Sequence, residues 1–175
     1  PDDPRNSLVE TFFDFANYLK PRYVLMENVP GMLSMDDGKV IKNIFQTFNE
    51  IGYDVRLNIL QAGYYGLPQN RWRVFIFCAK GGLTIPSFPK PKYLFPRTGV
   101  IGATKFKENI IAAPKEADLF WEANAMVTVG DAIKDLPPIE NGNKDDELHQ
   151  TYESQTRYQK LMKGKSKRIH DHICA

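Results

Sequence analysis

The fold of this chain is limited most strongly by residues 23–29, whose sequence is Tyr-Val-Leu-Met-Glu-Asn-Val. Four apolar residues in succession favour a buried strand in the middle of a parallel sheet, covered on both faces. A carboxylate, Glu27, follows where this strand is expected to end. Burying a charge is costly unless something binds it, and ligands of open α/β sheets lie beyond the carboxyl ends of the strands. The run therefore predicts that Glu27 meets a substrate, although a strand followed by an ordinary polar turn explains the pattern equally well.

A second polar cluster precedes a strand expected over residues 74–79. Arg71 and Arg73 alternate with other residues, so in extended geometry both side chains project to the same side. Guanidinium groups suit planar recognition of phosphate or carbonyl oxygens, and the nearby Gln69 both donates and accepts hydrogen bonds. Alone, this pattern is also typical of a solvated basic loop that leads into a strand.

Together the two clusters resemble the DNA (cytosine-5) methyltransferases. The family's Glu-Asn-Val motif is similar to residues 27–29, and its Gln-x-Arg-x-Arg motif is similar to residues 69–73, in the same order. Residues 128–137 are similar to a segment at the start of the family's target-recognition region. Residues 171–174 resemble the eukaryotic maintenance enzymes, and residues 23–29 also resemble plant chromomethylases. The resemblance implies a eukaryotic enzyme of the nucleus.

The resemblance also implies roles for individual residues. In the family, a cysteine thiolate adds to carbon 6 of cytosine, and carbon 5 then attacks the methyl group of S-adenosyl-L-methionine. Glu27 would bind ring N3 and the exocyclic amine of the target base, and Arg73 would bind its O2 carbonyl. Asn28 would fix the loop beside the nucleophile, and Arg71 would contact a phosphate or the catalytic loop. Gln69 would brace its own loop more than touch DNA.

Cofactor and partners follow from the same resemblance. Leu8, with Ser7 beside it, matches the position that packs on S-adenosyl-L-methionine. The target base must leave the duplex to reach such a pocket, so base flipping is implied. The expected partners are DNA and the remainder of the same catalytic domain.

The chain departs from the family pattern at two places. It contains no Pro-Cys-Gln segment, which carries the nucleophile, and no glycine-rich cofactor loop. Cys78 lies in an apolar strand, where a buried structural thiol is expected. These departures predict a fragment of a longer catalytic domain that is inactive alone.

Hydrophobic periodicity predicts the order of the elements. A helix is expected over residues 6–19, and Ser34 with Asp37 resembles a capping box for a second helix that ends near Gly52. Apolar and polar residues alternate over 53–59, which predicts a strand with one wet face. This order indicates an α/β fold, the later half of a Rossmann-like S-adenosylmethionine-dependent methyltransferase sheet.

The organisation changes after this sheet. Residues 1–84 are expected to be part of the catalytic domain. Four prolines predict an extended connection over 85–98. Residues 99–175 are expected to begin an irregular, partial target-recognition domain, with a helical turn at 131–136 and a short helix at 156–163.

Composition limits the other classes of function. The net charge of +2 is too small to indicate nucleic-acid binding by itself, and no apolar stretch is long enough to span a bilayer. His170, His172 and Cys174 alternate, but zinc normally needs a fourth ligand, so no metal site is expected. The basic residues between 160 and 168 suit DNA phosphates and a solvated loop equally.

Two other functions remain compatible with the sequence. One is a tRNA cytosine-5 methyltransferase of the same fold, although such relatives usually lack the glutamine found here as Gln69 and have a smaller recognition domain. The other is a catalytically dead, methyltransferase-like scaffold that binds DNA or another subunit.

Overall fold

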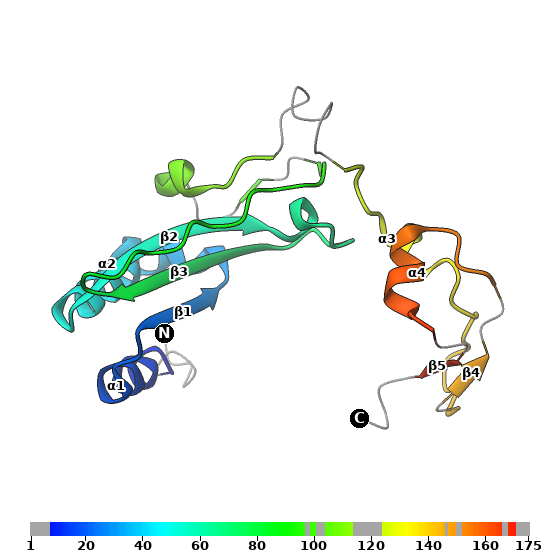
Figure 1. Cartoon of the computed structure of the whole chain (residues 1–175), viewed down its shortest axis with the longest axis horizontal. Coiled ribbons are helices and arrows are strands. Elements are labelled where there is room, and N and C mark those ends of the chain that lie inside the picture. The colour runs from blue at the N-terminus through cyan, green and yellow to red at the C-terminus, as the bar shows by residue number, and fades with distance from the viewer. Residues whose placement is uncertain are drawn as a thin grey trace.

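The computed structural model contains two groups of helices and strands (Figure 1). A three-stranded sheet with two helices forms the first group, and two short helices with a two-stranded antiparallel sheet form the second. The structure describes residues 8–96, 99–100, 104–113, 124–145, 147–149, 152–165 and 168–170.

The sheet has the order β1-β3-β2, and both pairs of strands are antiparallel. Its strands are β1 (Tyr23–Asn28), β2 (Tyr53–Gln61) and β3 (Trp72–Lys80). Side chains of alternate residues point to one face and form the core, among them Val74, Ile76 and Cys78 of β3, none of which is exposed. The strands predicted over 53–59 and 74–79 are therefore confirmed.

The prediction that residues 23–29 form a central parallel strand covered on both faces is wrong for the described residues. β1 pairs antiparallel with β3 and has no second partner in the part of the chain that the structure describes. Val24 and Met26 are buried, whereas Tyr23 and Leu25 are 41% and 54% exposed. Because the buried and the exposed residues are both apolar, the sequence does not show that buried and exposed side chains alternate along this strand.

Two helices cover the buried face of the sheet, α1 (Leu8–Leu19) and α2 (Lys39–Glu50). Phe48 of α2 is fully buried and makes edge-to-face contacts with Phe13 and Tyr53, at centroid distances of 5.2 and 5.9 Å. The expected C-terminal glycine of this helix is confirmed, because Gly52 adopts a φ of 87° just after it. The core therefore lies between these helices and one face of the sheet.

The expected capping box of Ser34 and Asp37 is wrong. Residues Pro30–Gly38 form the 3-10 segment η2, and α2 begins only at Lys39, with Gly38 as its N-cap and no side-chain cap. The Ser34 hydroxyl donates instead to the carbonyl of Gly31 at 3.0 Å. Gly38 has a φ of 85°, so the chain enters the helix through a left-handed turn that glycine adopts without strain.

The second group begins at residue 124, because the 3-10 segment η4 (Thr104–Asn109), which follows the proline-rich connection, still packs on the sheet through Phe106. Residues 83–96 form no helix or strand beyond an isolated bridge at Tyr93, as expected for the connection. Helices α3 (Val129–Ile133) and α4 (Arg157–Lys163) confirm the two short helices. The antiparallel pair of β4 (Glu147–His149) and β5 (Arg168–His170) was not predicted. No helix in the described ranges is long and apolar enough to cross a membrane.

Candidate active site

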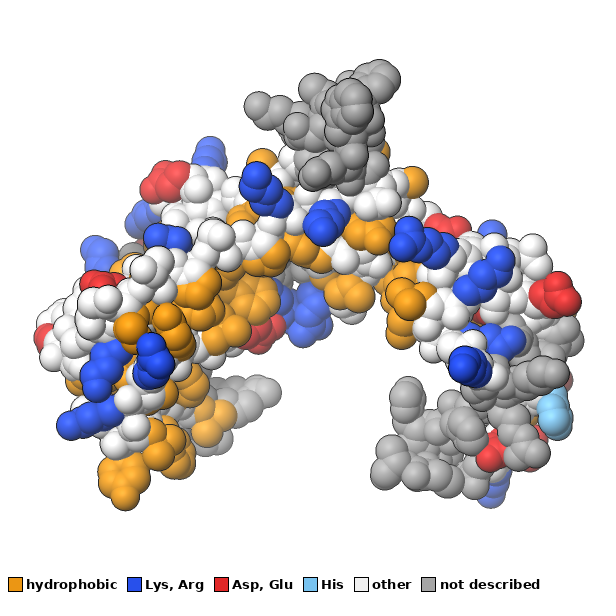
Figure 2. Space-filling model, in the orientation of Figure 1, with side chains coloured by type: hydrophobic (Ala, Val, Ile, Leu, Met, Phe, Trp, Pro, Cys, Tyr) orange, Lys and Arg blue, Asp and Glu red, His pale blue; other side chains and the backbone are white. Residues whose placement is uncertain are grey.

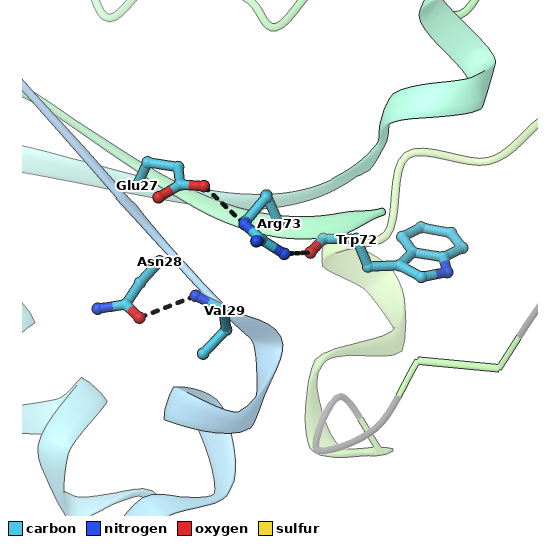
Figure 3. Close-up of polar contacts among 5 residues, drawn as sticks. All are labelled: Glu27, Asn28, Val29, Trp72 and Arg73. Carbon is cyan, nitrogen blue, oxygen red and sulfur yellow. Dashed lines mark hydrogen bonds and ion pairs between the residues drawn. The ribbon is translucent and has the colours of Figure 1, made fainter. Parts of the chain in front are cut away.

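The site is built on the ends of two neighbouring strands. Glu27 is the last residue but one of β1, and Arg73 is the second residue of β3. Asn28 pairs with Val74, so Arg73 lies one residue beyond the end of β1 and on the same sheet face as Glu27. The Arg73 Nε atom lies 2.7 Å from Glu27 Oε1 (Figure 3). The structure thus brings together two residues that are far apart in the sequence.

The ion pair leaves binding capacity on both partners. Arg73 uses Nε for the carboxylate and Nη1 for the Trp72 carbonyl, at 2.7 Å, so further guanidinium donors remain for a ligand. The Glu27 side chain is 47% exposed and that of Arg73 is 20% exposed. A pair so accessible to water typically contributes only about 0–1 kcal/mol to stability. The arrangement is therefore more significant as an oriented acid and hydrogen-bond donor than as a structural brace.

Asn28 lies on the other side of β1 from Glu27 (Figure 3). Its Oδ1 atom accepts a hydrogen bond from the backbone amide of Val29 at 2.8 Å, which holds the turn that follows the strand. Asn28 also lines a cavity of about 560 Å³ between α1, η2 and α2, together with Phe13 and Met32. The structure therefore does not join Asn28 to the Glu27–Arg73 pair.

Arg71 and Gln69 lie in the loop before β3, and both side chains are exposed. The Arg71 carbonyl accepts a hydrogen bond from the Ala62 amide at 2.9 Å, which fixes its backbone and leaves its guanidinium outside the sheet. Neither side chain contacts Glu27 in any interaction that the structure records. Both positions suit a group that approaches from solvent.

The loop itself is braced by a residue that sequence reasoning missed. Gln61 is fully buried, its Oε1 atom accepts from the Gly63 amide, and its Nε2 atom donates to Asn70 Oδ1 at 3.0 Å. A buried side-chain amide needs partners for both its oxygen and its nitrogen. A glutamine that ends a strand, immediately before a loop with two glycines, was the available signal.

The expected cofactor residues lie at the start of the described chain. Leu8 opens α1 with its side chain 61% exposed, and Ser7 lies outside the described residues. Cys78 is fully buried in β3, and burial raises the pKa of its thiol to about 12. The thiol is therefore neutral at physiological pH, which confirms its structural character and makes it a poor nucleophile.

The described residues include no group of three or more His, Cys, Asp and Glu side chains that could hold a metal ion. Of the three residues weighed as ligands, His172 and Cys174 lie outside the described residues, and the structure does not describe the His170 side chain.

Comparisons with known proteins show the family of this chain. Residues 1–173 match the family described as C-5 cytosine-specific DNA methylase. DNA (cytosine-5)-methyltransferase CMT1 of Oryza sativa subsp. japonica is 33% identical over 171 residues, which cover 98% of this chain and 16% of that protein. DNA (cytosine-5)-methyltransferase 1 of Gallus gallus is 33% identical over 177 residues, which cover 97% of this chain and 11% of that protein.

A solved structure is also similar. The crystal structure of a candidate DNA modification methyltransferase encoded within an E. coli prophage superposes with a TM-score of 0.55 at 25% identity, covering 91% of this chain and 40% of that one. The fold is that of part of a Rossmann-like methyltransferase. The chain belongs to the C-5 cytosine-specific DNA methylase family. It spans only a small part of the length of the relatives described above.

Proposed function

We propose that this chain forms the acid and guanidinium side of the active site of a nuclear DNA cytosine-5 methyltransferase. The observation that carries the proposal is the 2.7 Å contact between Arg73 Nε and Glu27 Oε1 at the carboxyl end of β1. The nucleophilic thiolate and the glycine-rich cofactor loop would come from other segments of the protein.

In this proposal Glu27 binds the edge of an extruded cytosine. When the thiolate forms its bond to carbon 6, the electron pair of the carbon 5–carbon 6 double bond forms a carbon 4–carbon 5 double bond, and the pair of the carbon 4–N3 double bond moves onto N3. A carboxyl group hydrogen-bonded to N3 and the exocyclic amine stabilises that charge, and such proton sharing typically accelerates reactions by about 10²–10⁴-fold. Arg73 holds one oxygen of Glu27 and offers its remaining donors to O2 of the same ring.

S-adenosyl-L-methionine would supply the electrophilic methyl group. Leu8 supports this assignment, because its exposed apolar side chain at the first turn of α1 can pack on a nucleoside. Ser7 beside it is a further proposed contact. Asn28 would order the turn after β1 through its bond to the Val29 amide.

DNA contacts are assigned to the loop before β3. Arg71 is exposed and has a fixed backbone, which suits a phosphate of the extruded nucleotide. Gln69 is proposed to hold the loop near that phosphate. Base flipping would bring the target ring to the Glu27–Arg73 pair.

The remainder of the catalytic domain is the proposed partner of an uncovered apolar face. Figure 2 shows apolar side chains gathered over α1 and β1. Phe15, Leu19, Tyr23 and Leu25 are 41–66% exposed and line a hollow of about 260 Å³. Beside it, β1 has no second strand partner among the described residues. An apolar surface next to an open strand edge favours burial against further elements of the sheet.

The test replaces Glu27 by Gln in the full-length protein. Gln keeps the shape of the side chain but cannot share a carboxyl proton with N3, so tritiated methyl transfer to duplex DNA should fall by about 10²–10⁴-fold. Glu50→Gln is the matched control, because Glu50 lies on α2 and bonds only Gln46 among the recorded contacts. An undiminished rate in the Glu27 variant would defeat the proposal.

The same assay separates the alternatives. Transfer to tRNA in place of DNA would indicate the RNA-modifying enzyme. A full-length protein that binds S-adenosyl-L-methionine but transfers no methyl group to either substrate would indicate the inactive scaffold.

A further inference from the structure

The proline-rich connection is fastened to the loop that carries Arg71. The backbone amides of Lys92 and Tyr93 both donate to the Tyr64 carbonyl, at 2.9 and 3.0 Å. The Tyr65 hydroxyl donates to the Pro89 carbonyl at 2.9 Å, and burial raises the pKa of Tyr65 to about 12, so it remains a donor at neutral pH. We call residues 89–95 the strap.

Two glycines of the loop lie directly against aromatic side chains of the strap. A Cβ atom on Gly63 would overlap the ring of Phe95, and one on Gly66 would lie 2.7 Å from Tyr93 Cε2. Gly66 also has a φ of 86°, whereas Gly63 has no left-handed φ. The backbone conformation therefore does not require glycine at position 63, and the packing of the Phe95 ring does.

The other side of the strap is bonded to the target-recognition part of the chain. The Leu94 amide donates to the Asn124 carbonyl at 2.9 Å, and the Asn124 amide donates to the Lys92 carbonyl at 2.7 Å. These bonds make the bridge between Tyr93 and Asn124, four residues before the N-cap of α3. The strap is thus held between the target-recognition part and the loop.

The loop passes these contacts on to the site. The Tyr64 ring meets the edge of Trp72 at a centroid distance of 5.8 Å, and the Ala62 amide holds the Arg71 carbonyl. The Trp72 carbonyl in turn accepts from Arg73 Nη1 at 2.7 Å. Contacts therefore run without interruption from Asn124 to the Glu27–Arg73 pair.

We propose that the strap positions Arg71 and Arg73 relative to the target-recognition part, with Gly63 and Phe95 as positioning residues. This inference rests on the proposed function. Packed rings and backbone hydrogen bonds couple the position of the strap to that of the loop before β3. A displacement of Phe95 therefore moves the start of β3. A misplacement of about 1 Å at a reacting group can lower the rate by about 10²-fold.

The experiment compares Gly63→Ala, Phe95→Ala and the double variant in the full-length protein. Gly63→Ala should lower kcat for DNA methylation by about 10- to 100-fold while changing KM for S-adenosyl-L-methionine little. The double variant should recover much of that loss, because the added methyl group then occupies space vacated by the ring. Gly99→Ala is the control, since a Cβ there meets nothing within 4 Å.

Amide hydrogen exchange provides a readout that does not depend on activity. In Phe95→Ala, the Ala62 amide should exchange faster, whereas the Gly52 amide, bonded to the Asn49 carbonyl, should not change. Wild-type kcat in Gly63→Ala, additive losses in the double variant, or unchanged exchange at Ala62 would each overturn the proposal. A wild-type protein without methyl transfer would refute the proposed function, and exchange at Ala62 would then decide the role of the strap alone.

Discussion

The two regions of this molecule are stabilised in different ways. In the sheet region, the buried residues are almost all apolar and form one cluster between the helices and the sheet. Beyond residue 124, the buried residues that the structure describes are Asp135 and Gln159, both polar. The comparison shows a sheet region held by an apolar core, joined to a second region held by directional polar contacts.

The polar contacts of the second region are specific. Thr128 and Asp131 form a capping box at α3, and the Thr128 hydroxyl and amide lower the pKa of Asp131 by hydrogen bonding. The Thr156 hydroxyl donates to the Asp131 carbonyl at 2.6 Å, and Ser154 donates to Asp135 at 2.6 Å. These hydrogen bonds join α3 to α4 and to the segment just before α4.

The largest expected difference between the regions is the loss of stability when a large side chain is truncated to alanine. Phe48→Ala should lower the local free energy of unfolding of the sheet by about 3–5 kcal/mol, because it leaves a cavity among fully buried side chains. Leu161→Ala on α4, a side chain that is 75% exposed, should change stability by less than about 0.5 kcal/mol. Native-state hydrogen exchange at β2, β3 and α4 measures both effects, and equal losses would show that the regions do not differ as described.

The next effect concerns the ion pair between Arg73 and Glu27 in the sheet region. Arg73→Lys keeps the positive charge but loses the planar fork that can hold Glu27 and a base together. We expect kcat for methyl transfer to fall by about 10²–10³-fold. Arg56→Lys, an exposed position of β2, serves as the control. An Arg73→Lys enzyme as fast as the control would separate the ion pair from catalysis.

A smaller effect is expected in the second region, beyond residue 124. Thr156→Ala removes the N-cap of α4, which accepts from the Gln159 amide at 3.1 Å, and should cost about 1 kcal/mol. Faster hydrogen exchange should be confined to α3 and α4, and Thr156→Ser should restore the native rates. Faster exchange in β3 as well would indicate that the two regions unfold together.

The smallest effect follows from Cys78. Its raised thiol pKa means that the folded state keeps the proton while the unfolded state loses it above about pH 8.5. Stability from this group is present below that pH and declines as the pH rises toward 12. In a Cys174→Ser background, alkylation at pH 8 should be limited by unfolding. Rapid labelling of the native protein would contradict the burial of Cys78.

Much of the sheet region could be predicted from sequence, because periodicity and motif order carry it. The convergence of Glu27 and Arg73 followed from the resemblance and was not derivable from spacing alone. The antiparallel pairing of β1 was missed because the exposed Tyr23 and Leu25 are apolar, as are the buried Val24 and Met26. The antiparallel pair of β4 and β5 was missed because three-residue strands have no measurable periodicity.

The loop before β3 shows why geometry adds to sequence. Gln69 is the brace expected from sequence, and the structure adds a second one, Gln61, whose buried side chain bonds Asn70. The packing of Phe95 on Gly63 was equally hidden, because it joins residues whose proximity depends on the path of the strap.

The most direct test of the account is a crystal structure of the full-length protein bound to a DNA duplex that contains its target cytosine. The account predicts an extruded cytosine with the Glu27 carboxyl group at N3 and the Arg73 guanidinium at O2, each within about 3 Å. A cytosine that remains stacked in the duplex, or one bound in a pocket that neither Glu27 nor Arg73 reaches, would contradict it.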